Sequence, residues 1–378
     1  MAPGAPDDAA AWRERARRLA EEAVRPHAEE IDRTDRLPAA LVRALAAEGL
    51  LGLGLPEELG GCGGDSRALV AVLEELAAVS SAVAVELAVH LSVCAHPIAR
   101  WGSDAQRRLY VPPLARGERI GAFALTEPGA GSDAAGLRTR YAAAAGGFEI
   151  SGAKMFISNA ATAGTIVVFA TRDPALGHRG ISAFALRPPT PGLSVAQRLD
   201  KLGLRGSETT ELVLDRVRAG PEALLGAEGD GLKIALSALA GGRVGIASCA
   251  LGVARAAFDR LRADVRADDA PWKRHRLARA FADLSAARAL VARAAERKDA
   301  GEEFVADASV AKFVASRAAV QIASDALEIA GPAGARSGAE AERLFRDARV
   351  FPLVEGTTEI QELILARELL GSKEERTV

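Results

Sequence analysis

A chain of 378 residues exceeds the usual size of one hydrophobic core, so we expect two or three domains that share interfaces. With 48 Lys and Arg against 50 Asp and Glu, the formal net charge of -2 offers no basic surface for nucleic acid and no polybasic segment for a membrane. The 3 cysteines and 5 histidines lack metal-ligand spacing, and no apolar run suggests a signal peptide or membrane span, so we expect a cytoplasmic protein without a metal.

Helical periodicity dominates the first third of the chain. Apolar residues recur at helical spacing over residues 12–31, 38–48, 67–79 and 81–100, and the turn-rich LPEELGGCGGD separates the second pair from the first. The pattern predicts an N-terminal α-helical domain over residues 1–119.

The period of the apolar pattern changes to two in the middle of the chain. Six segments punctuated by Gly and Pro have the character of short strands: RIGAFALTE, GFEISGAKMFIS, TIVVFATR, GISAFALRP, LSVAQ and TELVLDRV. They predict a middle antiparallel β-domain over residues 120–229.

Long helical patterns return after the strands, over residues 232–265, 272–299, 305–330 and 358–370. They predict a C-terminal α-helical domain over residues 230–378 that resembles a four-helix bundle. The fold class is therefore α+β multidomain, with helical domains on both sides of a β-domain.

Glu355 stands between the apolar run of residues 350–354 and the last predicted helix, which the capping box of Thr358 and Gln361 is expected to open. The helix dipole would slightly lower its pKa, whereas burial by the apolar run raises the pKa of a carboxyl by up to about 3 to 5 units and outweighs the dipole. A raised pKa suits a general base near neutral pH. An acid that only complements the helix dipole is the structural alternative.

Four motifs resemble the acyl-CoA dehydrogenase family, in that family's order: ALTEPGAGSDAAG, KMFISNAATA, DKLGLRGSETTELVLDRVR and RLFRDARVFPLVEGTTEIQELILAR. The resemblance covers nearly the whole chain, and the helix–strand–helix division agrees with the family's fold. It implies FAD-dependent oxidation of an acyl-CoA to a 2-enoyl-CoA, the work of an oxidoreductase acting on CH–CH groups.

The resemblance gives Glu355 the role of catalytic base, which removes the α-proton of a thioester while flavin N5 accepts the β-hydrogen as hydride. In some members the base lies just before the residue matching Arg243, but this chain has Gly242 there. The residues implied to contact substrate are Ser132, Arg243, Gly356 and Arg367. Those implied to contact FAD are Phe123, Leu125, Thr126, Gly131, Ser132, Phe156, Ile157, Ser158, Arg266, Glu328, Gly331, Thr357 and Glu359.

Two departures from the family pattern concern binding. In relatives a neighbouring subunit holds the FAD diphosphate; Arg266 and Gly331 match that pattern, but Asp269 and Glu328 introduce acids. We expect these acids to weaken FAD binding unless an arginine such as Arg276 compensates them. Ala240 also replaces an Asp that helps relatives to hold the pantetheine arm.

The resemblance implies a homo-oligomer, dimer or tetramer, that passes electrons to an electron-transfer flavoprotein. Three alternatives stay open: a dehydrogenase of an acyl carrier protein thioester, a flavin oxidase or monooxygenase, and a flavin-poor non-catalytic subunit. We expect the helix over residues 85–100 to border the acyl pocket through members of a set comprising Val89, Leu91, Val93, Cys94 and His96, while His90 and His96 are packed rather than catalytic.

Overall fold

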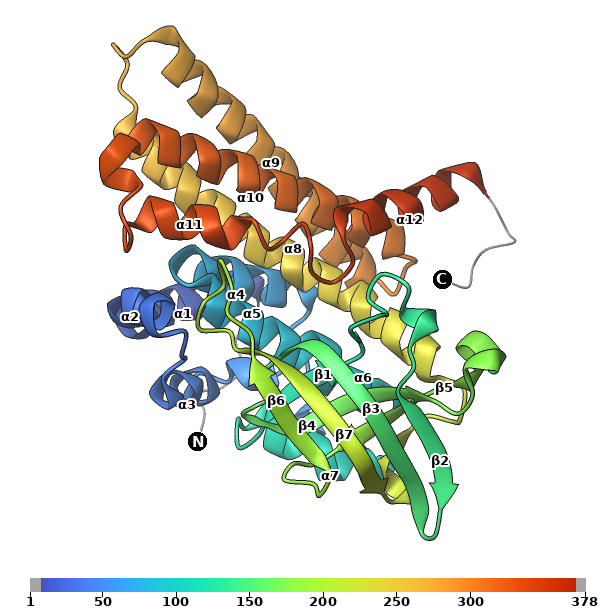
Figure 1. Cartoon of the computed structure of the whole chain (residues 1–378). Helices are drawn as coiled ribbons and strands as arrows, with labels where there is room; N and C mark the ends of the chain where they lie inside the picture. The colour runs from blue at the N-terminus through green and yellow to red at the C-terminus, as the bar shows by residue number, and fades with distance from the viewer. Residues whose placement is uncertain (1–7, 372–378) are drawn as a thin grey trace.

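The structure is a computed structural model that describes residues 8–371. Two groups of helices lie above and beside a single β-sheet (Figure 1). The N-terminal group contains α1 (Ala9–Leu19), η1 (Ala20–Val24), η2 (Arg25–His27), α2 (Ala28–Thr34), α3 (Ala39–Ala47), η3 (Leu50–Gly52), η4 (Glu57–Leu59), α4 (Ser66–Val79), α5 (Ser81–Ala88), η5 (Val89–Ala95), α6 (His96–Trp101) and α7 (Asp104–Ala115).

Helix α7 is an element that the sequence analysis did not predict. It begins at the capping box formed by Ser103 and Gln106, whose side chains exchange hydrogen bonds with each other's backbone N–H. Its last turn contains Pro112 and Pro113, which normally indicate the end of a helix. The helical pattern before these prolines was therefore too short to predict a helix.

The β-sheet has the strand order β6-β7-β3-β2-β4-β5-β8, with β1 paired to β4. Its strands are β1 (Ile120–Ala124), β2 (Arg140–Ala144), β3 (Gly147–Ser158), β4 (Ala163–Thr171), β5 (Ile181–Leu186), β6 (Leu193–Arg198), β7 (Thr209–Ala219) and β8 (Leu224–Leu225). Short 3₁₀ segments η6 (Ala134–Gly136), η7 (Pro174–Gly180) and η8 (Pro221–Ala223) connect them. Strands β2 and β8 are additions to the predicted set.

Most strand pairs are antiparallel, as predicted, but β1–β4 and β2–β4 are parallel. The reason is the connection: the chain between β1 and β4 contains the β2–β3 hairpin, so it is long enough for the crossover that parallel strands require. Periodicity within a strand carries no information about the direction of its partner.

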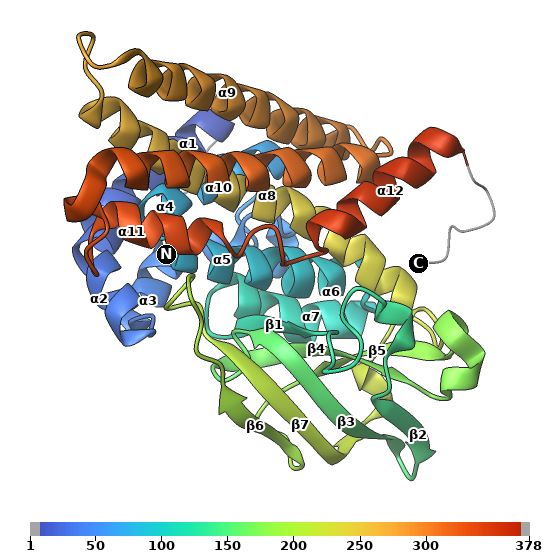
Figure 2. The same ribbon diagram turned by 45° about the horizontal axis from the view of Figure 1, so that its top comes forward.

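The C-terminal helices are α8 (Gly231–Asp264), α9 (Pro271–Asp299), α10 (Val305–Gly334), α11 (Glu340–Ala348) and α12 (Thr358–Leu370). Helices α8, α9 and α10 lie side by side in both views, whereas α12 projects away from the bundle (Figures 1 and 2). The short α11 was not predicted. The segment between α11 and α12 carries Glu355, whose carboxylate lies against Gly242 of α8.

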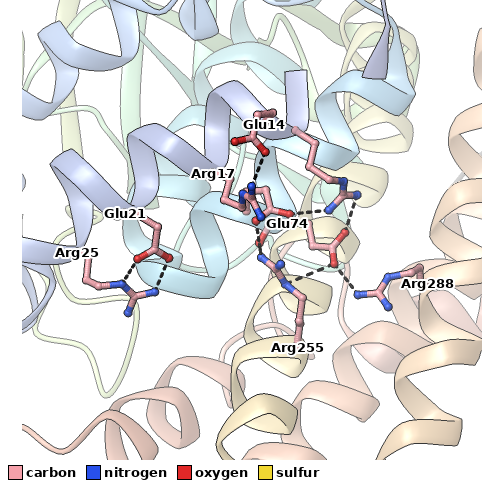
Figure 3. A network of polar contacts seen from close by, with 9 residues as sticks. Glu14, Arg17, Glu21, Arg25, Glu74, Arg255 and Arg288 are labelled. Atoms are coloured by element: carbon pink, nitrogen blue, oxygen red, sulfur yellow. Dashed lines mark hydrogen bonds and ion pairs between the residues drawn. The ribbon is translucent and has the colours of Figure 1, made fainter. Parts of the chain in front are cut away.

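A charge network centred on the buried Glu74 joins the two helical groups (Figure 3). The carboxylate of Glu74 on α4 forms ion pairs with Arg13 of α1 at 3.0 Å, with Arg288 of α9 at 2.7 Å and with Arg255 of α8 at 3.6 Å. Burial opposes ionisation of Glu74, but the three arginines hold its pKa below the ordinary value. The network therefore ties the N-terminal helices to the bundle that carries the site.

The sequence analysis expected no apolar segment long enough to span a membrane, and this was wrong: two segments qualify by length and hydropathy. Segments Ser81–Trp101 and Gly231–Asp264 both reach a mean hydropathy of 1.6, but 89% and 83% of their most apolar windows are buried inside the protein. Core helices pass the same test, because two-sided burial needs the same apolar composition.

The domain division at 119/120 and 229/230 remains a proposal, and it falls just before β1 and α8. The ends of the two outer domains, residues 1–7 and 372–378, lie outside the described residues.

Candidate active site

A cavity of about 840 Å³ lies where the three parts of the fold meet. Its walls come from α5 and η5, from β1 and the loop that follows it, from the end of β3, from α8, and from the segment over residues 350–367. The volume is in the range of sites that hold small molecules or cofactors. The sequence-predicted residues that line it are Phe123, Leu125, Thr126, Gly131, Ser132, Phe156, Ile157, Ser158, Arg243, Glu355, Gly356, Thr357 and Arg367.

One apolar wall of the cavity is formed by Val85, Val89 and Val93, which follow one another at intervals of four residues along α5 and the π-helix η5. This spacing puts them on a single helix face. Leu91 and Cys94 of the same segment are buried elsewhere and do not line the cavity. Periodicity had placed the segment correctly without deciding which residues face inward.

His90 is a packed core histidine, as expected. One ring nitrogen, Nε2, lies 3.1 Å from the carbonyl oxygen of Leu51, and the other, Nδ1, accepts a hydrogen bond from the Gly121 N–H at 3.0 Å. Burial lowers the pKa of His90 to about 4, so the ring stays neutral at physiological pH. His96 is also packed, with Nε2 at 3.1 Å from the Leu53 carbonyl.

Glu355 lines the cavity from an unusual backbone conformation, with φ of +50°. Its Oε2 is buried and has no hydrogen-bond partner among the described residues. Burial raises the pKa of Glu355 to about 7, although Arg243 and Lys312 act in the opposite direction. The direction of this pKa shift is the one expected from the sequence, and an unpartnered carboxylate of this kind is suited to accepting a proton.

The start of α12 differs from the predicted capping box. Thr357, not Thr358, is the N-cap, and its hydroxyl accepts a hydrogen bond from the Ile360 N–H at 3.4 Å. Gln361 instead donates to the carbonyl oxygen of Gly356 at 2.9 Å. The helix itself begins at Thr358, as predicted, and only the capping residue differs, next to the left-handed Glu355 and Gly356.

The loop after β1 is fixed by a buried ion pair that sequence reasoning missed. Lys154 of β3 is fully buried, and its Nζ donates to Glu127 Oε1 at 2.7 Å and to the Leu125 carbonyl at 3.0 Å. Glu127 also accepts the backbone N–H groups of Arg138 and Thr139, at 2.6 and 2.9 Å. Burial opposes ionisation of Glu127, but Lys154 holds its pKa below the ordinary value. The loop that carries Thr126, Gly131 and Ser132 is therefore held at both ends.

Four of the predicted site residues do not line the cavity: Arg266, Glu328, Gly331 and Glu359. Glu328 is paired with Arg276, and Asp269 accepts a hydrogen bond from the Arg266 N–H at 2.8 Å and lies 3.5 Å from Lys273. The acids of the altered diphosphate pattern thus have partners within this chain.

The open side of the cavity suits a planar aromatic cofactor. Phe156 is 64% exposed, with φ of +60°, and its ring stands at the cavity wall. The hydroxyl-bearing residues Thr126, Ser158 and Thr357 lie on the same cavity and provide donors and acceptors. A Cβ added at Gly129 would meet nothing within 4 Å, so the loop leaves room for a ligand beside it. These residues fit the isoalloxazine ring and ribityl chain of FAD. Within residues 8–371, no three His, Cys, Asp or Glu side chains are arranged to hold a metal ion.

An apolar cavity with a buried, unpartnered carboxylate oxygen at its wall is a candidate active site, of a kind that can remove a proton from a bound substrate. The sequence matches three family descriptions in chain order: "Acyl-CoA dehydrogenase, N-terminal domain" over residues 6–118, the middle domain over 122–217 and the C-terminal domain over 229–370. The chain belongs to the acyl-CoA dehydrogenase family and is an FAD-dependent oxidoreductase.

Individual relatives agree with that assignment. The acyl-CoA dehydrogenase of Bacillus subtilis is 41% identical over 95% of this chain and 97% of its own length. The solved structure of butyryl-CoA dehydrogenase from Megasphaera elsdenii has a TM-score of 0.93 and 35% identity, covering 98% of this chain and 100% of that one. A chain from a structure described as the electron-transferring flavoprotein of Acidaminococcus fermentans has a TM-score of 0.94 and 34% identity, covering 98% and 100%.

Proposed function

We propose that this protein oxidises a short-chain acyl-CoA to the 2-enoyl-CoA and that Glu355 is the base that removes the α-proton. The observation that carries the proposal is the buried, unpartnered Oε2 of Glu355 at the wall of an apolar cavity. A pKa raised to about 7 leaves the carboxylate strong enough as a base and ionised in a large fraction of molecules near neutral pH. Bound FAD would be the oxidant, which accepts the β-hydrogen as hydride.

The α-proton of a thioester is a weak acid, so the charge that develops on the carbonyl oxygen needs fixed donors. The family resemblance assigns the backbone N–H of Glu355 to this role. Gly356 has no side chain, and a Cβ there would lie 2.6 Å from Gln361 Nε2. The absence of a side chain at Gly356 therefore lets Gln361 pack against the turn that carries the base and donate to the Gly356 carbonyl oxygen.

The acyl chain would lie along the wall of Val85, Val89 and Val93, opposite Ile246 of α8. Ser132, Arg243 and Arg367 line the cavity where polar parts of the thioester would enter. Our preference for a short chain rests on the name of the butyryl-CoA dehydrogenase, whose structure is similar over its full length.

We propose that FAD is held by the cavity residues already described, together with Glu359 and, from a neighbouring subunit, Arg266, Glu328 and Gly331. This arrangement requires a homo-oligomer, dimer or tetramer. The large apolar side chains of Trp272 and Phe281 on α9 are 51% and 61% exposed, which is consistent with a partner on that face. An electron-transfer flavoprotein is the proposed electron acceptor, and the cytoplasm the proposed location.

A dehydrogenase acting on an acyl carrier protein thioester is the second candidate, and Ala240 is the observation that favours it. A buried Ala at this position of α8 cannot offer the carboxylate that relatives use for the pantetheine arm. The substitution favours the second candidate only weakly, because pantetheine is common to both carriers. Glu355 argues against the oxidase and monooxygenase readings, because oxygen-activating relatives often lack this base.

The purified protein tests the proposal through its flavin spectrum. Anaerobic addition of straight-chain acyl-CoAs should bleach the flavin, and matched acyl carrier protein thioesters should do so poorly. Glu355→Gln should keep the flavin but reduce it at least about a thousandfold more slowly, because the base and its charge are both removed. Reduction at a near wild-type rate would show that Glu355 is not the base.

A further inference from the structure

Lys312 is a fully buried lysine in the first third of α10, and its ammonium group contacts the segment that carries Glu355. Its Nζ donates to the carbonyl oxygen of Gly356 at 2.6 Å and to that of Pro352 at 3.3 Å. These two carbonyls flank Glu355 in the sequence. We call residues 352–356 the Glu355 turn.

The Glu355 turn has neutral donors in addition to Lys312. The Gly356 carbonyl also accepts Gln361 Nε2 at 2.9 Å, and the Pro352 carbonyl also accepts the Thr358 N–H at 2.9 Å. Burying an ammonium group costs far more than burying a neutral donor. A fold that needed only hydrogen bonds here would be served by Gln361 and Thr358, so the charge of Lys312 calls for a separate reason.

The backbone of the Glu355 turn explains part of that reason. Glu355 and Gly356 are both left-handed, with φ of +50° and +91°, a conformation that a glutamate adopts only when its surroundings impose it. Lys312 contacts the carbonyls on both sides of this pair. The conformation it holds is the one that brings Glu355 Oε2 against Gly242 of α8.

The electrostatic surroundings of Glu355 explain the rest. Arg243 of α8 and Lys312 of α10 act to lower the pKa of Glu355, whereas burial, and secondarily Glu355, raise the pKa of the Cys249 thiol of α8. The carboxylate of Glu359 on α12 acts to raise the pKa of Lys312. Lys201 and Arg367 line the same cavity. Burial lowers the pKa of Lys312 to about 8, so the ammonium is mostly charged at pH 7. Burial raises the pKa of Glu355, and Lys312 and Arg243 limit that rise.

We propose that Lys312 is a positioning residue for Glu355, which fixes the Glu355 turn and supplies a buried positive charge that keeps the carboxylate ionised. The inference rests on the proposed role of Glu355 as base. It assigns Lys312 no contact with the substrate.

The test compares Lys312→Met with Gln361→Met, because both remove a donor to the Gly356 carbonyl but only the first removes a charge. For Lys312→Met, the pH at which flavin reduction reaches half its maximal rate should rise by roughly one unit, as expected when a nearby opposite charge is lost. The maximal rate should fall while KM changes little. For Gln361→Met the rate should fall without a shift in that pH. Lys312→Arg should keep the wild-type midpoint, since it keeps the charge.

A second measurement does not depend on activity. Infrared difference spectra between acid and neutral pH report protonation of a carboxylic acid, and the band lost in Glu355→Gln identifies Glu355. Its midpoint should also rise by roughly one unit in Lys312→Met. If Lys312→Met does not fold, Lys312→Gln removes the charge and keeps a donor, and the same shift is expected.

If the pH midpoint is unchanged in Lys312→Met and in Lys312→Gln, by either method, the proposed role of Lys312 is overturned. The proposed role of Glu355 is then unaffected. Conversely, rapid flavin reduction by Glu355→Gln would refute the proposed function itself. The two failures are therefore distinguishable.

Discussion

Gly242 leaves the space that the carboxylate of Glu355 occupies: a Cβ added at Gly242 would lie 1.9 Å from Glu355 Oε2. Gly242 is buried within the long helix α8, where alanine would be favoured by about 1 kcal/mol over glycine. The chain thus carries a helix-weakening residue at the point of contact with the proposed base. The same position is where some family members are expected to carry their base, so the two placements of the carboxylate exclude each other sterically.

Gly242→Ala should displace the Glu355 carboxylate and lower kcat by at least about a hundredfold, because misplacing a reacting group by about 1 Å has effects of that size. Flavin content and thermal stability should change little by comparison. Flavin reduction rates in a stopped-flow instrument, with absorbance ratios for flavin content, measure both quantities.

Gly241→Ala is the matched control for that substitution. A Cβ at Gly241 would lie 3.7 Å from Lys298 Nζ, which is ordinary van der Waals contact. This variant should retain nearly the full rate. If Gly242→Ala and Gly241→Ala react equally fast, the fit between Gly242 and Glu355 does not matter for the reaction.

Glu86 is a buried carboxyl that the proposed reaction does not use, and its ionisation should weaken the fold. Burial, and secondarily Glu208, raise its pKa from 4.5 to about 8. The folded state therefore binds a proton that the unfolded state releases, and stability contributed by this group falls as pH rises from about 4.5 to about 8. Glu86→Gln should be nearly neutral at pH 5 and stabilising by on the order of 1 to 3 kcal/mol at pH 9, as measured by urea unfolding.

Glu127→Gln should have the opposite effect and serves as the control. Its pKa is lowered by Lys154 against the effect of burial, so its stabilisation is present above the unfolded pKa of about 4.5 and is lost as pH falls below that value. Removing it leaves Lys154 buried without its partner, at a cost of about 3 kcal/mol near pH 7. Similar unfolding curves for the two variants at pH 7, where Lys154 is still mostly charged, would contradict the assigned environments.

The ion pair between Glu328 and Arg276 changes the expectation for FAD retention. Because Glu328 is already paired, and Arg276 also lies 5.2 Å from the centre of the Trp272 ring, Glu328→Gln should not tighten FAD binding. A change of less than about fivefold, or weaker binding, is expected for an exposed pair of this kind. Arg266→Ala should release FAD, because Arg266 is proposed to contact the diphosphate of the FAD bound in a neighbouring subunit.

Titration of the apo-protein with FAD, at low and high salt, measures these affinities, and light scattering gives the mass of the species that binds. A dimer or tetramer is expected. Tighter binding by Glu328→Gln would mean that the acid faces the diphosphate after all, and a monomer that retains FAD would contradict the shared site.

Features that depend on residues close together in the chain could be predicted from the amino-acid sequence. Apolar spacing separated helices from strands and divided the chain into helical, β and helical parts, because the side-chain periods of helix and strand differ locally. The apolar run before Glu355 indicated its burial, and the motif around it carried the family resemblance. Where local signals were weak, as at Pro112 and Pro113 in α7, an element was missed.

The neighbours of Glu355 could not be predicted from the sequence, because they come from distant parts of the chain. Gly242 and Lys312 are distant from it in the chain, and no spacing rule relates three residues on α8, α10 and the turn before α12. The same holds for the inward faces of Val85, Val89 and Val93, and for the parallel pairing of β1 with β4. These relationships follow from how whole elements pack, because close packing fixes the neighbours of a side chain only after the helices and the sheet have taken their places.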